Sequence, residues 1–107
     1  MSIKYPVIDV SSTGKNLRRL CILQGISVRD LQRYCGFSNP QSVYRWFSGA
    51  NLPSVDNLYA LSVLLGVTMN DIIVDKDDDV VFALLTYKVN ETVNEFWYIE
   101  FEYDKVQ

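Results

Sequence analysis

The sequence predicts a mainly α-helical protein, a domain of five short helices followed by a C-terminal β-hairpin. Between residues 15 and 73, apolar residues recur at helical spacing in short stretches that end at Gly25, Gly36, Gly49 and Gly66. After an acidic stretch, the pattern changes to β-branched and aromatic residues, which favour strands. These changes divide the chain into an extended arm (1–12), a helical domain (13–74), an acidic hinge (75–79) and a hairpin (80–107).

The first two helices are predicted from their caps and their apolar spacing. The arm contains a proline and β-branched residues, which are typical of extended backbone, and residues 11–13 then offer N-caps for a helix over residues 15–24. Ser27 followed by Asp30 resembles a capping box, in which each residue's side chain accepts from the other's backbone N–H. We therefore expect a second short helix over residues 28–35.

The third, fourth and fifth helices follow at short intervals. Asn39 and Pro40 supply a cap and a first-turn proline for a helix over residues 40–48. A fourth helix is predicted to begin at Ser54 and to end before the next glycine. Its expected buried stripe consists of Val55, Leu58, Leu61 and Leu65. A second capping-box pattern at residues 68–71 opens a short fifth helix.

The C-terminal part has the pattern of two strands. The runs 80–89 and 96–103 are rich in β-branched and aromatic residues, and residues 90–95 form a polar connector between them. In the second run the apolar residues alternate with glutamates, and they are Trp97, Ile99, Phe101 and Tyr103. A helix over residues 80–88 is the alternative. Because an isolated hairpin is barely stable in water, we expect it to pack on another surface.

Composition restricts the classes of function. The chain has no histidine, no glycine-rich phosphate loop and no cysteine in a reactive setting, so we predict that it is not an enzyme. Cys21 and Cys35 fall at helical core positions, and we expect both to be buried and reduced. The acidic hinge lacks the glycine and the distal glutamate of a calcium loop, so neither a metal nor another cofactor is predicted.

Charge is distributed unevenly along the chain. Residues 1–74 contain seven Lys and Arg against four Asp, a net charge of +3, whereas residues 75–107 contain three Lys against nine Asp and Glu, a net charge of −6. The N-terminal part is therefore the part suited to a polyanion. The chain has no long apolar run and no apolar leader, which predicts a cytoplasmic protein without a membrane partner.

The predicted second and third helices suit one task in particular. The major groove of B-DNA, ~12 Å wide, admits a single helix, and a neighbouring helix steadies it against the backbone. On the third helix, Val43 and Trp46 are expected to face the core. The side chains expected to point away from the core are Asn39, Gln41, Ser42, Tyr44 and Arg45. Gln and Asn can pair with adenine and Arg with guanine, so this face is suited to reading base edges.

Several short motifs have the joint spacing of a known family. They are Ser27-Val28-Arg29-Asp30-Leu31, Gly36-Phe37-Ser38, Val43-Tyr44-Arg45-Trp46, Gly49, Leu52-Pro53-Ser54-Val55-Asp56-Asn57-Leu58 and Leu65-Gly66-Val67. With them, residues 13–73 resemble the lambda-repressor-like, Cro-type (xenobiotic-response-element) helix-turn-helix family. The resemblance implies a five-helix fold and binding to operator DNA as a homodimer. It implies DNA contacts from the third helix, and phosphate contacts from the starts of the second and fourth helices.

The chain departs from this family pattern at three places. The sequence Asn39-Pro40-Gln41 holds one residue more than the usual spacing between the turn glycine and Val43, which changes how the third helix enters the groove. Gln32 stands where the family typically has alanine. Val28 stands where the family often has a glutamine that touches a phosphate. These departures affect the expected contacts more than the fold.

The sequence thus gives a set of candidate DNA-contacting residues. They are Lys15, Arg29, Asn39, Gln41, Ser42, Tyr44, Arg45, Asn51 and Ser54. Several of them have a structural alternative. Arg45 could pair with Asp30, Asn39 and Ser54 could serve only as helix caps, and Tyr44 could cover the edge of the core.

Two functions from different classes are compatible with these observations. The first is a sequence-specific DNA-binding transcriptional regulator that places residues 40–48 in the major groove and acts as a homodimer, with the hairpin as a possible dimerisation element. The second is a protein-interaction module on the same scaffold, an antitoxin or a phage-type inhibitor. It would bind a protein partner through the acidic, aromatic C-terminal segment.

Overall fold

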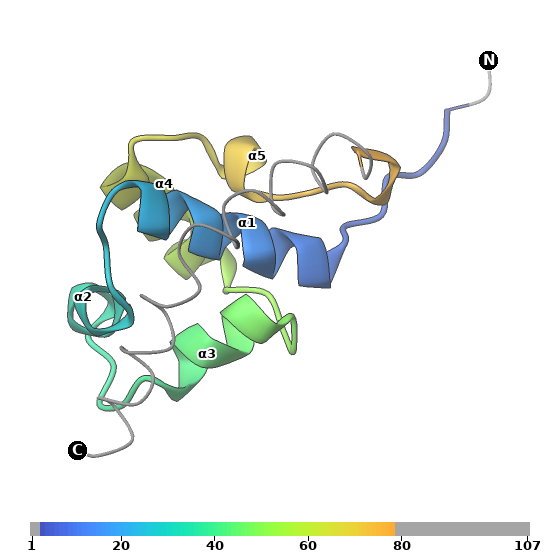
Figure 1. Cartoon of the computed structure of the whole chain (residues 1–107). Helices are drawn as coiled ribbons and strands as arrows, with labels where there is room; N and C mark the ends of the chain where they lie inside the picture. The colour runs from blue at the N-terminus through green and yellow to red at the C-terminus, as the bar shows by residue number, and fades with distance from the viewer. Residues whose placement is uncertain (1–2, 79–107) are drawn as a thin grey trace.

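The computed structural model describes residues 3–78, and within this range the backbone forms five α-helices and one 3-10 turn (Figure 1). The helices are α1 (Val10–Leu23), α2 (Val28–Cys35), α3 (Gln41–Ser48), α4 (Val55–Leu65) and α5 (Met69–Ile72), followed by the turn η1 (Lys76–Asp78). The prediction of five short helices is confirmed. The predicted hairpin over residues 80–107 lies outside the described residues.

The predicted caps of α2, α4 and α5 are present. At α2, the Asp30 backbone N–H donates to Ser27 Oγ and the Ser27 N–H donates to Asp30 Oδ2, both over 3.0 Å. The predicted box at residues 68–71 has the same two bonds at the start of α5. At α4, Ser54 Oγ accepts from the Asn57 N–H over 3.2 Å. These side chains satisfy N–H groups that have no partner within the helix, and they fix where each helix begins.

The predicted start of the first helix was wrong. The helix begins at Val10 rather than Lys15, because Asp9 is the N-cap and its Oδ1 accepts from the Ser12 N–H over 2.9 Å. Residues 10–12, expected to belong to the extended arm, are therefore helical. The β-branched residues of this turn do not prevent a helix, since helix propensity is a weak preference that tertiary packing overrides.

The five helices enclose one hydrophobic core. In Figure 1, α1 crosses the molecule with α3 on one side of it and α5 on the other, and α2 stands at one end. The core consists of Leu17, Cys21, Val28, Leu31, Val43, Trp46, Leu58, Leu61, Leu65 and Ile72. Trp46 also meets Phe37 edge to face, with ring centroids 5.6 Å apart, which holds the turn between α2 and α3 against α3. Val55 is not part of this core, contrary to the predicted stripe, because 72% of it is exposed.

The crossing of α1 over α3 is unusually close. A Cβ atom at Gly14 would collide with the carbonyl oxygen of Trp46 and would lie 3.0 Å from that of Phe47. The C-terminal end of α3 is close to α1 as well, since a Cβ at Gly49 would lie 2.7 Å from the Ser11 Cα. Glycine at these two positions therefore allows the α1 and α3 backbones to approach, and it fixes the position of α3.

Polar side chains of α1 hold the end of α5. Asn16 is buried, and its Nδ2 donates to the carbonyl oxygens of Asp71 and Ile72 over 2.8 and 2.9 Å. Its Oδ1 accepts from Arg19 Nη2 over 2.8 Å. Thr13 is also buried, and its Oγ1 accepts from the Val74 N–H over 2.9 Å. These bonds satisfy the backbone groups where α5 ends.

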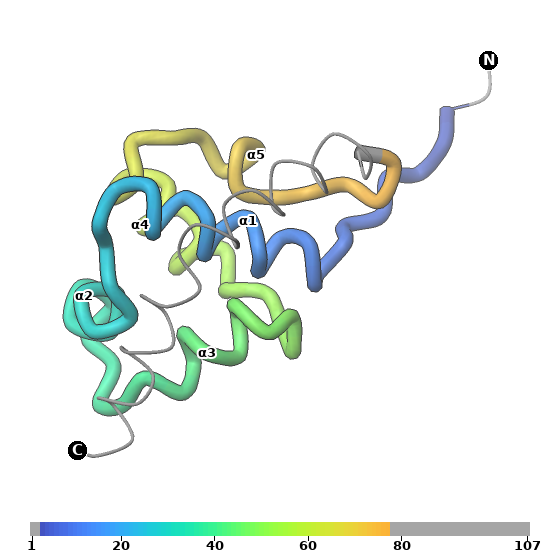
Figure 2. The backbone as a smooth tube through the Cα atoms, in the orientation of Figure 1, coloured from blue at the N-terminus to red at the C-terminus, as the bar shows by residue number. Residues whose placement is uncertain are grey.

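The N-terminal arm runs beside the segment that follows α5 (Figure 2). Ile8 and Asp75 form an antiparallel bridge, in which the Asp9 N–H donates to the Val74 carbonyl over 2.8 Å and the Lys76 N–H donates to the Val7 carbonyl over 3.0 Å. No helix among the described residues is long and apolar enough to cross a membrane.

Candidate nucleic-acid interface

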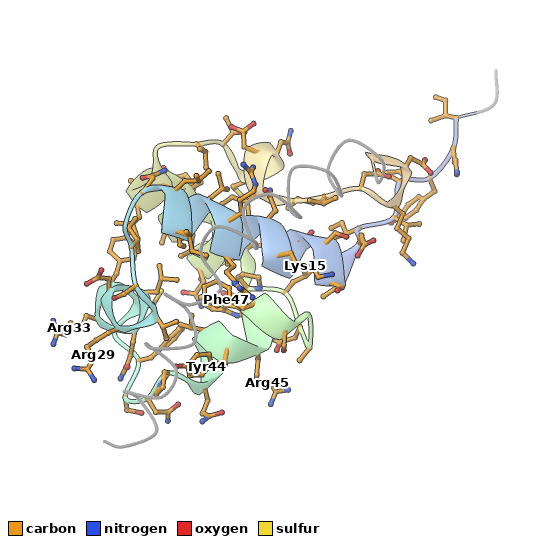
Figure 3. The ribbon with its side chains drawn as sticks, in the orientation of Figure 1. Lys15, Arg29, Arg33, Tyr44, Arg45 and Phe47 are labelled. Atoms are coloured by element: carbon orange, nitrogen blue, oxygen red, sulfur yellow. The ribbon has the colours of Figure 1, made fainter. Side chains whose placement is uncertain are left out.

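The outward face of α3 is polar. Val43 and Trp46 are buried, with exposed fractions of 0% and 3%, and they fix the rotation of the helix about its axis. Gln41 and Arg45 are exposed and Ser42 is half-buried, so these side chains lie on the side of α3 that faces away from the core. Figure 3 shows Arg45 projecting from this side. The predicted inward pair and these three outward residues are thus confirmed, whereas Tyr44, which was predicted to point away from the core, packs against it.

Arg45 is oriented by the loop that follows its own helix. Its Nε donates to Asn51 Oδ1 over 3.1 Å, and Asn51 Nδ2 in turn donates to the Leu52 carbonyl over 3.2 Å. The side chain that bonds Arg45 in the structure is thus Asn51, and not Asp30 as in the alternative considered from the sequence. The bond to Asn51 uses one of the five guanidinium N–H donors, so the planar fork that can recognise a base or a phosphate remains available.

Three other candidate residues contribute to the structure around α3 and α4. Asn39 Oδ1 accepts from the Gln41 N–H over 3.0 Å, although the N-cap position itself is occupied by Pro40. Ser54 caps α4 and is exposed. Tyr44 is half-buried and packs against the core. A structural contribution of this kind does not remove a side chain from an interface, since Asn39 and Ser54 both face solvent.

Three arginines lie on one side of the molecule. Arg29 and Arg33 from α2 and Arg45 from α3 point toward the same side in Figure 3, and α3 itself contains no acidic residue. Lys15 is exposed on α1, near the C-terminal half of α3. Sequence reasoning missed Arg33. Its position four residues after Arg29 puts both side chains on one face of a helix, and this spacing could have identified it.

The structure explains two of the departures from the family pattern. Five residues, 36–40, connect α2 to α3. Gln32 Nε2 donates to the Phe37 carbonyl over 3.3 Å, and the Phe37 N–H donates to the Gln32 carbonyl over 2.9 Å, so Gln32 ties the start of this connection to α2. Val28 is completely buried, so that position cannot contact a phosphate.

The titratable groups near the core include two thiols and one guanidinium. Cys21 is fully buried and Cys35 half-buried, both are free thiols, and burial raises the pKa of Cys35. Burial also lowers the pKa of the Arg18 guanidinium. Among residues 3–78, no three His, Cys, Asp or Glu side chains come together as metal ligands would. The predicted burial is confirmed for Cys21, whereas Cys35 is only half-buried.

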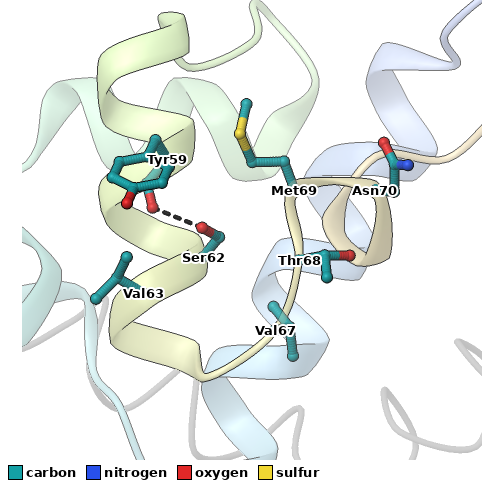
Figure 4. A pocket seen from close by; sticks show the side chains of 7 residues that line it. All are labelled: Tyr59, Ser62, Val63, Val67, Thr68, Met69 and Asn70. Atoms are coloured by element: carbon teal, nitrogen blue, oxygen red, sulfur yellow. Dashed lines mark hydrogen bonds between the residues drawn. The ribbon is translucent and has the colours of Figure 1, made fainter.

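A second surface feature lies on α4. Val55, Tyr59 and Val63 are spaced four residues apart and are exposed by 72%, 63% and 61%, so they form an apolar stripe on the outside of the helix, the α4 stripe. A shallow groove of about 480 Å³ continues from it toward α5 (Figure 4). The groove is lined by Tyr59, Ser62, Val63, Val67, Thr68, Met69 and Asn70.

Comparison with known proteins agrees with this geometry. A family model described as helix-turn-helix matches residues 17–72, which is more than half of the 107 residues. A solved structure with the same fold is the restriction-modification controller protein C.AhdI from Aeromonas hydrophila. It is 23% identical, has a TM-score of 0.54, and the match covers 60% of this chain and 96% of that chain. Comparison with curated protein sequences gives no significant match. The chain belongs to the Cro-type helix-turn-helix family of DNA-binding regulators.

Proposed function

We propose that the protein is a sequence-specific transcriptional regulator that inserts α3 into the major groove of its operator DNA. The observation that supports this most directly is the outward face of α3, which carries Gln41, Ser42 and Arg45. The arginines of α2 point toward the same side as Arg45 (Figure 3). In a helix-turn-helix, the second helix of the pair reads base edges while the first crosses the backbone. α2 and α3 have the sequence order and exposed groups for these two tasks.

Each exposed side chain has a role that follows from its chemistry. Gln41, in the first turn of α3, can bond adenine through both its amide groups, and Arg45 can bond guanine through its planar fork. Because Asn51 already holds the Arg45 Nε, part of the cost of ordering this long side chain is met before DNA binds. We assign Ser42 and Tyr44 to contacts at the edges of the same helix.

The cations around α3 are assigned to phosphates. Arg29 and Arg33 lie on α2 and Lys15 lies on α1, so these cations flank α3 from two helices and can reach the two edges of a groove in which α3 is inserted. We add Asn39 and Ser54 as polar contacts to the sugar-phosphate backbone, since each faces solvent near the end of a helix. Phosphate contacts position the protein and carry no sequence information, so base specificity is assigned to Gln41 and Arg45.

Fluorescence anisotropy on duplex DNA from around the protein's own gene tests this proposal. Affinity should exceed that for a scrambled duplex, and the logarithm of affinity should fall steeply with the logarithm of salt concentration between about 50 and 200 mM, because phosphate binding releases counterions. If the protein binds neither duplex at low salt, the proposal is contradicted.

We further propose that the active form is a homodimer. The predicted hairpin, residues 80–107, was considered as a dimerisation element and lies outside the described residues. Within the described residues, the α4 stripe provides an exposed apolar surface. Two copies joined by a two-fold axis would present two α3 helices to half-sites about 34 Å apart. In analytical ultracentrifugation we expect a dimer that Tyr59→Lys converts to a monomer. Tyr34→Phe, which alters an aromatic side chain on α2 without adding charge, serves as the control.

The α4 stripe also supports the second candidate function, a protein-interaction module. An exposed apolar row with an adjoining groove suits an apolar segment of a partner. The two functions predict different responses to Gln41→Ala with Arg45→Ala. A regulator should lose DNA affinity, whereas an interaction module should retain its partner.

A further inference from the structure

Residues 3–8 form an extended arm whose apolar side chains are exposed to solvent. The exposed fractions of Ile3, Tyr5 and Val7 are 78%, 86% and 47%. Ile8, the next apolar residue of the arm, is exposed by 40% as well. A contiguous row of exposed large apolar side chains is characteristic of a surface that another segment covers.

The end of the arm is already paired with the segment that follows α5, through one isolated bridge. Ile8 bridges Asp75 in antiparallel register, with one hydrogen bond on each side of the pair, from Asp9 to Val74 and from Lys76 to Val7. In such a pair the N–H and C=O groups of Ile8 point away from Asp75, toward the opposite edge of the arm. Nearer its N-terminus the arm makes an ion pair of 3.3 Å between Lys4 and Asp77, which is exposed and therefore contributes little to stability. The arm therefore presents both an apolar face and an open edge.

The rest of the chain begins beside this surface. The described fold ends at residue 78, next to the arm, and 29 residues follow. Within them, the runs 80–89 and 96–103 have the composition of strands, and two strands alone are barely stable in water. A third strand and an apolar face are what such a hairpin lacks.

We propose that residues 80–103 dock on the arm of the same chain. They would extend the pairing between Ile8 and Asp75 into a small sheet, and they would cover Ile3, Tyr5 and Val7. The same chain is the occupant because the segment starts next to the arm. A short connection raises its effective concentration there to the millimolar range, and closing so short a loop costs little entropy. The α4 stripe is a less suitable site for this segment, because a helix has no open backbone edge with which a strand can pair.

This arrangement has a consequence for the surface charge. Residues 79–107 contain two Lys against six Asp and Glu, a net charge of −4. The arm projects away from α3 in Figures 1 and 2. A segment held on the arm therefore keeps its negative charge away from the face that carries Arg29, Arg33 and Arg45.

Hydrogen–deuterium exchange of the full-length chain tests the docking. Tyr5→Ser should accelerate exchange of the amides of residues 80–103 by about tenfold or more, the factor expected when one apolar side chain is no longer covered. Leu23→Ser is the matched control, because it truncates another exposed apolar side chain, 62% exposed at the end of α1, and it should leave exchange in this segment unchanged. Equal exchange in wild type and Tyr5→Ser would overturn the proposal. Far-UV circular dichroism checks that the helices persist in both variants.

A second measurement identifies which chain supplies the segment. Isotope-filtered NMR on an equal mixture of labelled and unlabelled full-length protein separates contacts within a chain from contacts between chains. We expect contacts between Tyr5 or Val7 and residues 80–103 only within a chain. Contacts between chains would show that a second copy covers the arm and that the segment is a dimerisation element, which contradicts the proposal. Neither measurement depends on DNA binding.

Discussion

A few single residues of the described fold combine a polar side chain with a buried position, and sequence patterns identify such positions least well. Asn16 and Thr13 lie on the same face of α1 as Leu17, yet they bond backbone groups more than fifty residues away. Because the first helix was predicted to start at Lys15, Thr13 was not predicted to be helical. A local pattern contains no information about a partner so far along the chain.

Replacement of Asn16 should therefore be costly. Asn16→Ala removes both donors to the end of α5 and leaves the buried carbonyl oxygen of Ile72 without this partner. We expect a loss of roughly 1–3 kcal/mol in the free energy of unfolding, measured by urea denaturation. Asn70→Ala, at an exposed position on α5, should change the stability by less than about 0.5 kcal/mol. Equal effects of the two substitutions would contradict the role assigned to Asn16.

The Asp71 capping box gives a prediction about pH. The Thr68 backbone N–H, followed by the Thr68 side chain, lowers the pKa of Asp71 below its ordinary value of 3.8. A lowered pKa in the folded state means that the carboxylate stabilises the fold above the unfolded-state pKa, and that this contribution disappears as the pH falls through the folded-state pKa. Asp71→Asn should therefore reduce stability at neutral pH and make little difference in strong acid. A deficit that is the same at both pH values would show that the charge is not responsible.

At the scale of helices, caps and apolar spacing were sufficient to predict the number of helices, and they located the starts of α2, α4 and α5 closely. They did not predict how the helices cross, because crossing depends on contacts between distant segments. Gly14 illustrates this limit. The sequence placed it just before the predicted helix. In the structure it lies within α1, where glycine is unfavourable by helix propensity, at the point where α1 meets the carbonyl oxygens of α3.

Gly14→Ala separates these two views by the sign of its effect. Helix propensity alone predicts stabilisation by about 1 kcal/mol. The structure predicts that the free energy of unfolding falls by about 1–3 kcal/mol or more. The added methyl group would collide with backbone atoms, which cannot rotate away. Gly25→Ala serves as a comparison at a position with open space, where only the left-handed backbone, φ +70°, opposes the substitution. Thermal and urea denaturation of the two variants would measure the difference.

At the scale of the whole molecule, the polar face of α3 and the family were predictable from sequence, because they follow from helical periodicity and from short motifs. The arrangement of charge around α3 was only partly predictable. Arg33 lies on α2, and the sequence analysis treated that helix mainly as a support for the third helix. The hydrogen bond between Arg45 and Asn51 joins a residue of α3 to one beyond the end of that helix, so helical periodicity does not predict it. Net charge alone, −3, would have argued against DNA binding.

The central claim is that α3 reads base sequence, and the most direct measurement is the ratio of affinities for the native and the scrambled duplex. Fluorescence anisotropy at one salt concentration would compare wild type with Gln41→Ala plus Arg45→Ala, and Lys4→Ala would control for the loss of a charge on the arm. We expect the double variant to reduce this ratio by at least about tenfold, because each bidentate base contact contributes ~1–3 kcal/mol of discrimination, and we expect Lys4→Ala to preserve the ratio. A double variant that weakens binding to both duplexes equally, or that leaves the ratio intact, would contradict the claim.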